Sequence, residues 1–371
     1  MTNRYTNVPK SDNKPENVVI IRGGGDLASG TIHRLYRCGY RLLVLECEKP
    51  TAIRRMVSFC EAVYDGQSSV EGVLCRKVDS VEECEAVWKA GEIPLMADTE
   101  GTVLKKYRPA ALIDAILAKK NLGTTREMAG LTVGLGPGFV AGEDVDYVVE
   151  TMRGHNLARI ITKGAAMPNT GVPGIIGGFG KERVLHAPAA GEIHCISKIA
   201  DIVEKDQVLA WIGDTPVRAS LTGVLRGMIR DGFTVPKGMK IADIDPRKEQ
   251  KKNCFTISDK ARCIAGSVLE ILLSEGVMPY EAPVDFWNCC RVDYEKYPVI
   301  AVVGGGGKTS LIYRLTDELI DKGKRVIITT TTHMAGESEL PFARGGDAVR
   351  VKELLDKERY VIAAEYEEDT G

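Results

Sequence analysis

Three glycines and the cationic residues behind them are the first part of this chain whose residue types and spacing suggest chemistry. Gly134, Gly136 and Gly138 follow a short β-branched run, and Arg153 and His155 come soon after them. Glycine has no side chain, so backbone amides in such a loop can approach an anion closely, and nearby cations strengthen the attraction. The spacing predicts a binding site for a phosphate-bearing ligand.

A second glycine loop lies near the N-terminus, after the apolar run VVII. Gly23, Gly25 and Ala28 match the GxGxxA form of the dinucleotide fingerprint, and Glu46 follows at about the distance expected for an acid that binds ribose hydroxyls. Asp26 would stand at the start of the next helix, where its carboxylate can cap the amides and repel a pyrophosphate. A nucleotide or pterin site and a structural turn are therefore both open interpretations of this loop.

Two adjacent arginines, Arg54 and Arg55, follow the second predicted strand. Guanidinium groups can bind phosphate or carboxylate in a fork, although arginines at a helix start can also be solvated. Both glycine loops follow predicted parallel strands, so we expect them at the carboxyl ends of a sheet, where one crevice can be lined by both. The sequence does not identify a catalytic residue. The predicted cofactor-binding residues are Gly23, Gly24, Gly25, Asp26, Arg54, Arg55, Gly134, Gly136, Gly138, Arg153 and His155.

The stretch VIAVVGGGGKTS, residues 299–310, carries the most specific chemical signal. A strand that runs into glycines, a lysine, a hydroxyl residue and a helix is typical of a loop that wraps phosphates, with the hydroxyl on Mg²⁺. Val302 takes the first glycine position of GxxxxGK[ST], so the form present is GxxGKT. The predicted nucleotide-binding residues are Gly304, Gly305, Gly306, Gly307, Lys308, Thr309 and Ser310, with Thr309 also on the Mg²⁺ of ATP or GTP.

The sequence after this loop is short for a nucleotide-binding domain. A strand is expected in KRVIITTTTHM, and only one more helix and strand follow before Gly371. A complete domain of this kind needs a sheet of about five strands, and no acidic Walker B candidate is evident. We therefore expect the chain to end inside this domain.

Strands and helices must alternate to position these loops, and residues 17–180 have that pattern. RLLVLE and IPLMAD read as strands, and VEECEAVWKAG reads as a helix. The apolar spacing of Val145, Val148, Val149 and Met152 predicts another helix directly after the second glycine loop. The alternation predicts an α/β fold with a Rossmann-like, mostly parallel sheet covered by helices on both faces.

The pattern changes after Gly180, where short strands are expected and the sequence repeats itself at a spacing of 32. Two such copies predict a small β sandwich with a pseudo-twofold axis, built like the biotinyl and lipoyl carrier domains. The segment GDTPVR between the copies contains no lysine, so a structural or docking role is expected. The matched pairs include Val203 and Val235, Ala210 and Ala242, and Ile212 and Ile244.

These patterns together predict five segments. A capped helix is expected within the fourth, starting at Ser258 or Asp259 and ending at Gly276. The segments are a flexible tail at 1–16, a Rossmann-like α/β domain at 17–180, a biotinyl/lipoyl-like β domain without a carrier lysine at 181–247, a helix and linker at 248–297, and a partial P-loop domain at 298–371.

Composition excludes several classes of protein. With 49 basic and 51 acidic residues, the formal charge of −2 gives no electrostatic footprint for nucleic acid or an anionic membrane. The first apolar run is too short for a signal peptide or a membrane span, so a cytoplasmic protein is expected. Ten cysteines without a CxxC pair predict neither a disulfide framework nor a zinc site.

Several motifs, taken in order, resemble one family. RGGGDLASG, AIRRMVSFCEAVYDG, GLGPGFVAG with ETMRGHNLARI, and GAAMPNTGVPG together resemble the YqeB-type accessory proteins of the selenium-dependent molybdenum hydroxylase system, over about residues 17–276. GLGPGF and ETMRGH are also similar to the Rossmann-like domain of xanthine dehydrogenase accessory proteins. VVGGGGKTS with TTTTHM resembles the YqeC-type accessory protein of the same system, which implies a fusion with an incomplete second partner.

The resemblance implies a role in maturing a selenium-dependent molybdenum hydroxylase. The chain would bind the molybdenum cofactor, a phosphate-bearing pterin (molybdopterin), and pass it to that client enzyme. Residues 134–138, Arg153 and His155 would hold the cofactor phosphate, and residues 23–25 would complete the crevice. Three alternatives are open. They are an NAD(P)-dependent oxidoreductase, supported by Glu46, a stand-alone P-loop ATPase or kinase, and a non-catalytic scaffold, supported by the repeat.

Overall fold

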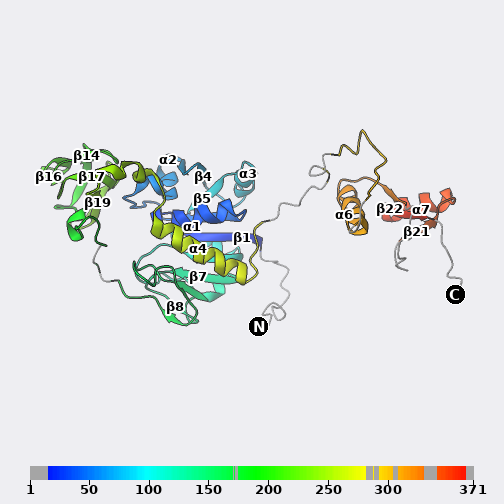
Figure 1. Ribbon diagram of the computed structural model, residues 1–371, viewed down its shortest axis with the longest axis horizontal. Helices are drawn as coiled ribbons and strands as arrows, with labels where there is room; N and C mark the ends of the chain where they lie inside the picture. Colours follow the sequence, from blue (N-terminus) through cyan, green and yellow to red (C-terminus); the bar gives the residue numbers. More distant parts are fainter. Residues whose placement is uncertain are drawn as a thin grey trace. The chain divides into compact units, whose positions relative to one another are not determined.

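The computed structural model describes residues 16–169, 171, 174–280, 287, 292–303, 308–329 and 341–364. The chain divides into two compact units, Met1–Tyr280 and Glu281–Gly371. Each has its own core and is described by itself (Figure 1). Among the described residues, no helix has both the length and the apolar character needed to cross a membrane.

The larger unit is built on a nine-stranded sheet in the order β10-β9-β7-β6-β1-β2-β5-β4-β3. The interior pairs are parallel, and only the two edge pairs, β3 with β4 and β9 with β10, are antiparallel. The expected α/β fold with a large, mostly parallel sheet is therefore confirmed. The strands are β1 (Glu16–Arg22), β2 (Arg41–Glu46), β3 (Gln67–Val70), β4 (Val73–Val78), β5 (Ile93–Ala97), β6 (Pro109–Asp114), β7 (Leu131–Leu135), β9 (Tyr147–Val149) and β10 (Ile160–Ile161).

Two long helices lie side by side against this sheet (Figure 1). They are α1 (Asp26–Arg37) and α4 (Asp259–Ser274), and α4 returns from far along the sequence to share the core of the sheet. Ser258 caps α4 by accepting a hydrogen bond from the Ala261 N–H, as the sequence predicts. Two shorter α-helices, α2 (Ala62–Asp65) and α3 (Cys84–Lys89), and a 3-10 helix at Lys248–Phe255 belong to the same unit.

The helix predicted after the second glycine loop is wrong. The segment instead forms β8 (Val140–Ala141), which pairs with β11 (Gly164–Ala165), and then β9, which joins β7 in parallel. The carboxylate of Asp146 fixes the entry to β9 because it accepts hydrogen bonds from the N–H and the hydroxyl of Thr132, both at 2.9 Å. The buried valines whose spacing suggested a helix lie in two places, with Val145 in an isolated β-bridge and Val148 and Val149 in β9. Such β-branched residues favour extended backbone.

Residues 184–245 form two four-stranded antiparallel sheets around a single core. A shift of 32 residues carries each strand of one sheet onto its counterpart in the other, in the same order. Matched apolar residues such as Val203 and Val235 are buried in both copies, which explains why the repeat is visible in the sequence. The sheets are β12 (Val184–His186), β19 (Lys240–Asp245), β17 (Gly223–Met228) and β14 (Ile202–Val203), and β16 (Thr215–Arg218), β15 (Val208–Ile212), β13 (Gly191–Cys195) and β18 (Thr234–Val235).

The smaller unit contains a parallel three-stranded sheet in the order β20-β22-β21. A strand was expected in KRVIITTTTHM, and β20 occupies part of it, whereas residues 330–334 lie outside the described residues. The elements are α6 (Lys308–Asp321), β20 (Val326–Ile328), β21 (Phe342–Arg344), α7 (Ala348–Glu358) and β22 (Tyr360–Ala364).

Candidate functional site

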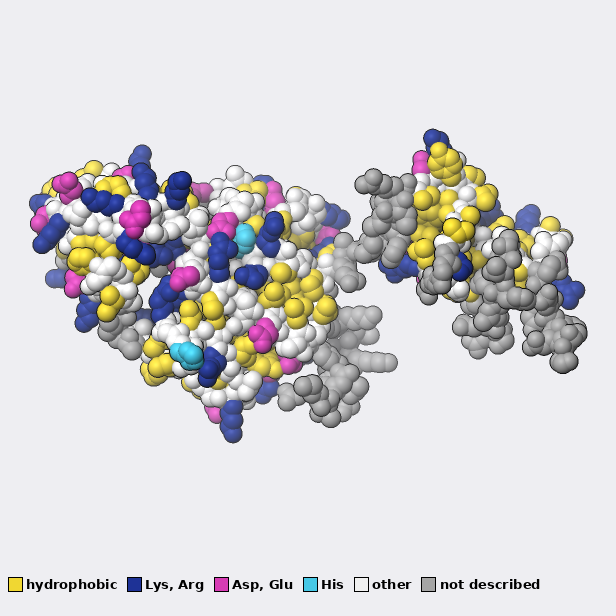
Figure 2. Space-filling model, in the orientation of Figure 1, with side chains coloured by type: hydrophobic (Ala, Val, Ile, Leu, Met, Phe, Trp, Pro, Cys, Tyr) yellow, Lys and Arg dark blue, Asp and Glu magenta, His cyan; other side chains and the backbone are white. Residues whose placement is uncertain are grey.

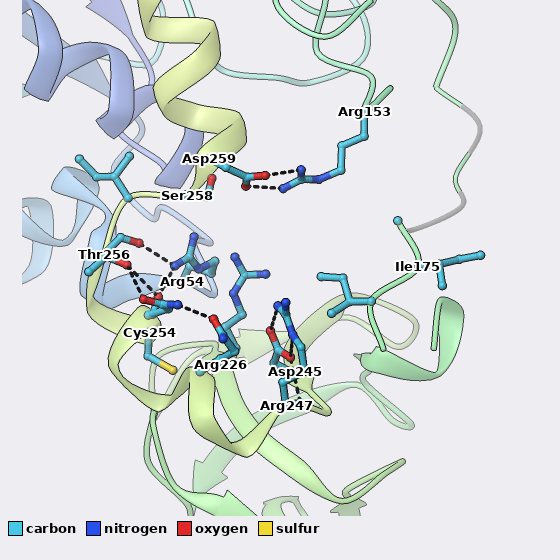
Figure 3. A pocket seen from close by; sticks show the side chains of 15 residues that line it. Arg54, Arg153, Ile175, Arg226, Asp245, Arg247, Cys254, Thr256, Ser258 and Asp259 are labelled. Carbon is cyan, nitrogen blue, oxygen red and sulfur yellow. Dashed lines mark hydrogen bonds and ion pairs between the residues drawn. The ribbon is translucent and has the colours of Figure 1, made fainter. Parts of the chain in front are cut away.

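A cavity of about 450 Å³ lies in the larger unit, where several segments that are distant in the sequence converge (Figure 3). Its charged lining consists of four arginines and two aspartates, so it carries two more positive than negative side chains. Figure 2 shows dark-blue Lys and Arg side chains gathered where the part that contains β14 to β19 adjoins the rest of this unit. The charged residues of the lining are Arg54, Arg153, Arg226, Arg247, Asp245 and Asp259.

Arg54 is the most buried of these four arginines, with 6% of its side chain exposed. Its Nη2 donates to the carbonyl oxygens of Asn253 and Thr256, both at 3.1 Å. Its Nη1 lies 3.8 Å from a carboxylate oxygen of Asp26, beyond hydrogen-bond distance. Within the described part of the chain, its buried Nε has no hydrogen-bond partner. A buried guanidinium with an unused donor is a feature that an anionic ligand would satisfy.

Arg226, on β17, lies near Arg54 in the cavity (Figure 3). Burial lowers the pKa of Arg54, and the positive charge of Arg226 lowers it further. Arginine nevertheless keeps its proton in proteins, so the repulsion persists. Among the described residues, Arg226 forms an ion pair with a shared carboxylate, because Asp243 lies 3.5 Å from it and also accepts hydrogen bonds from Arg183 at 3.0 and 3.2 Å. We call Arg54 and Arg226 the central arginines.

The other two arginines of the lining are each held by a carboxylate. Arg153 donates to both oxygens of Asp259 at 2.7 Å, and Arg247 donates to both oxygens of Asp245 at 2.9 and 2.8 Å. The hydrogen bonds from Arg153 hold the pKa of Asp259 well below its usual range. Burial and the charge of Arg153 lower the pKa of the neighbouring Lys260. We call these two ion pairs the flanking pairs.

Arg54 and Arg153 are the predicted site residues that the structure brings together in this cavity. Arg55 is directed elsewhere, since its Nε donates to the carbonyl of Met228 at 2.9 Å and its Nη1 lies 3.7 Å from Glu61. His155 is exposed and is not among the lining residues. The adjacent arginines of the sequence therefore have different environments.

The first glycine loop is tied down by protein groups. A Cβ on Gly23 would lie 3.0 Å from the carbonyl oxygen of Ala115, and one on Gly24 would lie 3.0 Å from the backbone nitrogen of Cys60. Glu46 accepts the Gly24 N–H at 2.8 Å, so this carboxylate already has a partner within the loop. Only Gly25 has open space around its Cβ position among these three.

Close packing also explains why the second loop has glycines at these positions. A Cβ on Gly134 would meet the Phe139 ring at 2.5 Å, and one on Gly138, where φ is +116°, would meet the backbone of Lys120 at 2.6 Å. A Cβ on Gly136 would lie 2.6 Å from the hydroxyl of Thr151. Residues 115–120 thus contact both glycine loops. A direct role of either loop in cofactor binding stays a prediction.

The point at which the strand order reverses, between β1 and β6, is occupied by a buried polar network. Arg22 donates to the hydroxyl of Thr124 at 2.6 Å, and this hydroxyl donates to Asp114 at 2.6 Å. Arg22 and Asp114 also form an ion pair at 3.5 Å. Burial raises the pKa of Asp114 above its ordinary value. Ligands commonly bind at such a reversal, but here protein side chains take that position.

Sequence reasoning missed Arg226 and Arg247. They lie about 70 to 90 residues beyond His155, the last predicted cofactor-binding residue, and belong to no motif. One signal was available, since Arg226 is the only charged residue in the apolar stretch GVLRGM, which forms β17. A charged residue within an otherwise apolar strand can mark a site.

The nucleotide-binding prediction falls partly outside the described residues. Gly304, Gly305, Gly306 and Gly307 are not described, and neither is the side chain of Ser310. Lys308 is the first residue of α6, and Thr309 is exposed in its first turn. The helix begins directly after the glycines, as predicted. The strand expected before them is wrong, because residues 299–303 form no strand and Val299 and Val303 are exposed.

The chain is similar to two curated proteins and to one family. Over 256 residues it is 48% identical to a protein of Escherichia coli (strain K12) described as "Uncharacterized protein YqeB", which covers 69% of this chain and 47% of that protein. Over 36 residues it is 64% identical to "Uncharacterized protein YqeC" of the same organism, covering 10% of this chain and 14% of that one. The family described as YqeC protein matches residues 300–370. The chain thus spans about half the length of the YqeB relative.

Solved structures give only weak likenesses. The apo structure of the ectoine utilization protein EutE from Ruegeria pomeroyi has 9% identity and a TM-score of 0.21, covering 61% of this chain and 85% of that one. An aspartoacylase family protein from Mesorhizobium loti has 11% identity and a TM-score of 0.22, covering 62% of this chain and 85% of that one. Scores this low carry no argument about fold or function.

Proposed function

Because the chain joins a YqeB-like region to a YqeC-like region, as its motifs predict, we propose that it is an accessory factor in the maturation of a selenium-dependent molybdenum hydroxylase. It binds the molybdenum cofactor, a phosphate-bearing pterin, and passes it to the client enzyme. The support for this role is the family resemblance together with a cavity suited to a phosphate.

The observation that carries the binding proposal is the pair of central arginines. Two guanidinium groups repel each other in a cavity of about 450 Å³, and one of them has a buried donor without a partner among the described residues. Arginine binds phosphate through charge-assisted hydrogen bonds and is the usual residue for that task. The volume falls within the range of about 300–1,000 Å³ typical of small-molecule sites. The cofactor phosphate is therefore assigned to the central arginines.

Two parts of the larger unit supply the lining of this cavity, and the smaller unit has a separate role. Loops of the Rossmann-like part, after β2 and after β9, supply Arg54 and Arg153. The biotinyl/lipoyl-like β domain supplies Arg226 and Asp245, which gives that domain a structural role without a carrier lysine. The YqeC-like region binds ATP or GTP with Mg²⁺ through residues 304–310. The protein acts in the cytoplasm.

The NAD(P)-dependent alternative is not favoured by the geometry. An acid that binds ribose hydroxyls needs free oxygens, whereas Glu46 accepts the N–H groups of Gly24 and Cys47, both at 2.8 Å. Close packing of Gly24 against Cys60 also leaves little room for a pyrophosphate at this loop.

Pterin fluorescence tests the proposal on the full chain. We expect saturable binding of molybdopterin to the wild-type chain and a loss of affinity of about tenfold or more in Arg226→Gln, since a charge-assisted hydrogen bond contributes about 1.5–3 kcal/mol. Arg218→Gln is the matched control, because Arg218 is exposed on β16 and donates to the carbonyl of Asp206. Absence of binding to the wild-type chain, or equal affinity in all three chains, would contradict the proposal.

A further inference from the structure

We propose that the cavity selects ligands with one terminal phosphate, as in a phosphate monoester, over ligands with a diphosphate group. This inference rests on the proposed function and names the class of ligand that the same site accepts. The selectivity comes from the contrast between the central arginines and the flanking pairs (Figure 3).

The central arginines match the charge of one phosphate monoester. Such a group carries about −1.5 to −2 at neutral pH, and Arg54 and Arg226 together carry two positive charges. The nearest carboxylates compensate them weakly, with Asp26 at 3.8 Å from Arg54 and Asp243 at 3.5 Å from Arg226 and shared with Arg183. One phosphate placed here neutralises both guanidinium groups.

The flanking pairs leave no equivalent place for a second phosphate. Arg153 and Arg247 each present their donors to both oxygens of a carboxylate, at distances between 2.7 and 2.9 Å. A second phosphate would have to displace Asp259 or Asp245 or lie beside its negative charge. Both cost free energy, because the bidentate hydrogen bonds are lost or because like charges approach each other.

Asp259 is the residue whose removal most directly changes this selectivity. Its side chain is 74% exposed, so it can be replaced without leaving a buried gap, and its loss leaves Arg153 free to bind another anion. Asp259→Asn should therefore improve the binding of a diphosphate more than the binding of a monophosphate. Asp245 has the same relation to Arg247 but is buried, which makes it the less suitable position for a test.

The test is isothermal titration calorimetry of the full chain with inorganic phosphate and with pyrophosphate. The chain carries Lys308→Ala and the buffer contains EDTA, so that the predicted nucleotide loop contributes little. We expect phosphate to bind about fivefold more tightly than pyrophosphate, which corresponds to roughly 1 kcal/mol of like-charge repulsion. Asp259→Asn should remove that preference, and Asp214→Asn, the same charge change at an exposed turn, should preserve it.

Each outcome decides between the two proposals. Tighter binding of pyrophosphate than of phosphate overturns the selectivity inference, and so does a preference for phosphate that Asp259→Asn leaves unchanged. In either case, phosphate binding that depends on Arg226 keeps the proposed function intact. Phosphate binding that is absent, or equally tight in Arg226→Gln, overturns the role of the cavity and the inference with it.

Discussion

Arg54 is held by main-chain oxygens of Asn253 and Thr256 rather than by a close carboxylate, and this arrangement preserves its charge for a ligand. The flanking arginines have the opposite environment, because each is paired with an aspartate. The four arginines of the cavity therefore differ in how free their donors are to bind a ligand, and this difference decides where an anion is expected to bind.

At the residue scale the buried network between β1 and β6 makes a first prediction. Thr124→Val removes the hydroxyl that accepts from Arg22 and donates to Asp114, so two buried charged groups lose a partner. We expect the free energy of unfolding of the larger unit to fall by about 1–3 kcal/mol, measured by chemical denaturation. Thr125→Val at the exposed neighbouring position should change it by less than about 0.5 kcal/mol. Equal effects of both changes would contradict this account.

The Arg153–Asp259 pair makes a prediction about pH. The hydrogen bonds from Arg153 lower the pKa of Asp259 below its ordinary value of 3.8, so the stabilisation is present above that pH and is lost as the pH falls toward the pKa of the folded state. Because the pair is exposed, Asp259→Asn should cost less than about 1 kcal/mol at pH 7. Thermal unfolding should show this difference at pH 7 and a smaller one near pH 3. A difference that grows on acidification would be inconsistent with the ion pair.

Some of the site could be predicted from single residues, and the reason for the rest is physical. Arg54 was predicted because it follows a predicted strand beside a second arginine, and Arg153 because it comes soon after a glycine loop. Arg226 and Arg247 come from another part of the chain, and only the packing of β17 and β19 against the α/β part brings them to the same cavity. Contacts of this range leave little local pattern in the sequence beyond the single charged residue within the apolar strand β17.

At the scale of elements, the contact between α1 and α4 fixes the geometry around the cavity, since α4 begins at its lining residue Asp259. The two helices meet at a glycine, where a Cβ on Gly30 would lie 2.7 Å from the Cβ of Ala261. Helices approach this closely only where one of them carries a very small residue.

This contact gives a pair of opposite predictions. Gly30→Ala should destabilise the larger unit by about 1–3 kcal/mol, because the added methyl group overlaps Ala261. Gly266→Ala, within α4, should stabilise it by up to about 1 kcal/mol, because its Cβ position is open and alanine favours helix. Thermal denaturation of both variants measures the two shifts, and a shift of the same sign in both would refute the proposed contact.

The elements also show where periodicity is informative. The 32-residue repeat was visible because the matched residues are buried in both sheets. The helix expected over residues 145–152 was wrong because Val145 and Val148 are buried by a bridge and a strand rather than by one helical face. A few valines at spacings of three and four cannot separate these two cases.

At the scale of the whole molecule, two compact units have separate cores. The order of a YqeB-like region followed by a YqeC-like region was predicted and is confirmed. The order of the two regions could be predicted because each motif is a short, continuous stretch of sequence. The cavity could not, because its residues come together only when the larger unit is folded.

Separate cores predict separate responses to ligands. ATP with Mg²⁺ should raise the unfolding temperature of the smaller unit, and inorganic phosphate without Mg²⁺ should raise that of the larger unit, because each ligand stabilises the unit that binds it. Differential scanning calorimetry of the full chain measures both transitions, and Lys308→Ala should abolish only the effect of ATP. A shift of the larger unit by ATP that depends on Lys308 would contradict the assignment.

The central claim is that the central arginines hold the phosphate of a pterin cofactor. Mass spectrometry of the small molecules released from natively purified chains tests it most directly. The account predicts a phosphorylated pterin from the wild-type chain and from Arg218→Gln, and about tenfold less from Arg226→Gln. Release of a dinucleotide or of no small molecule, or the same amount of pterin from all three chains, would contradict it.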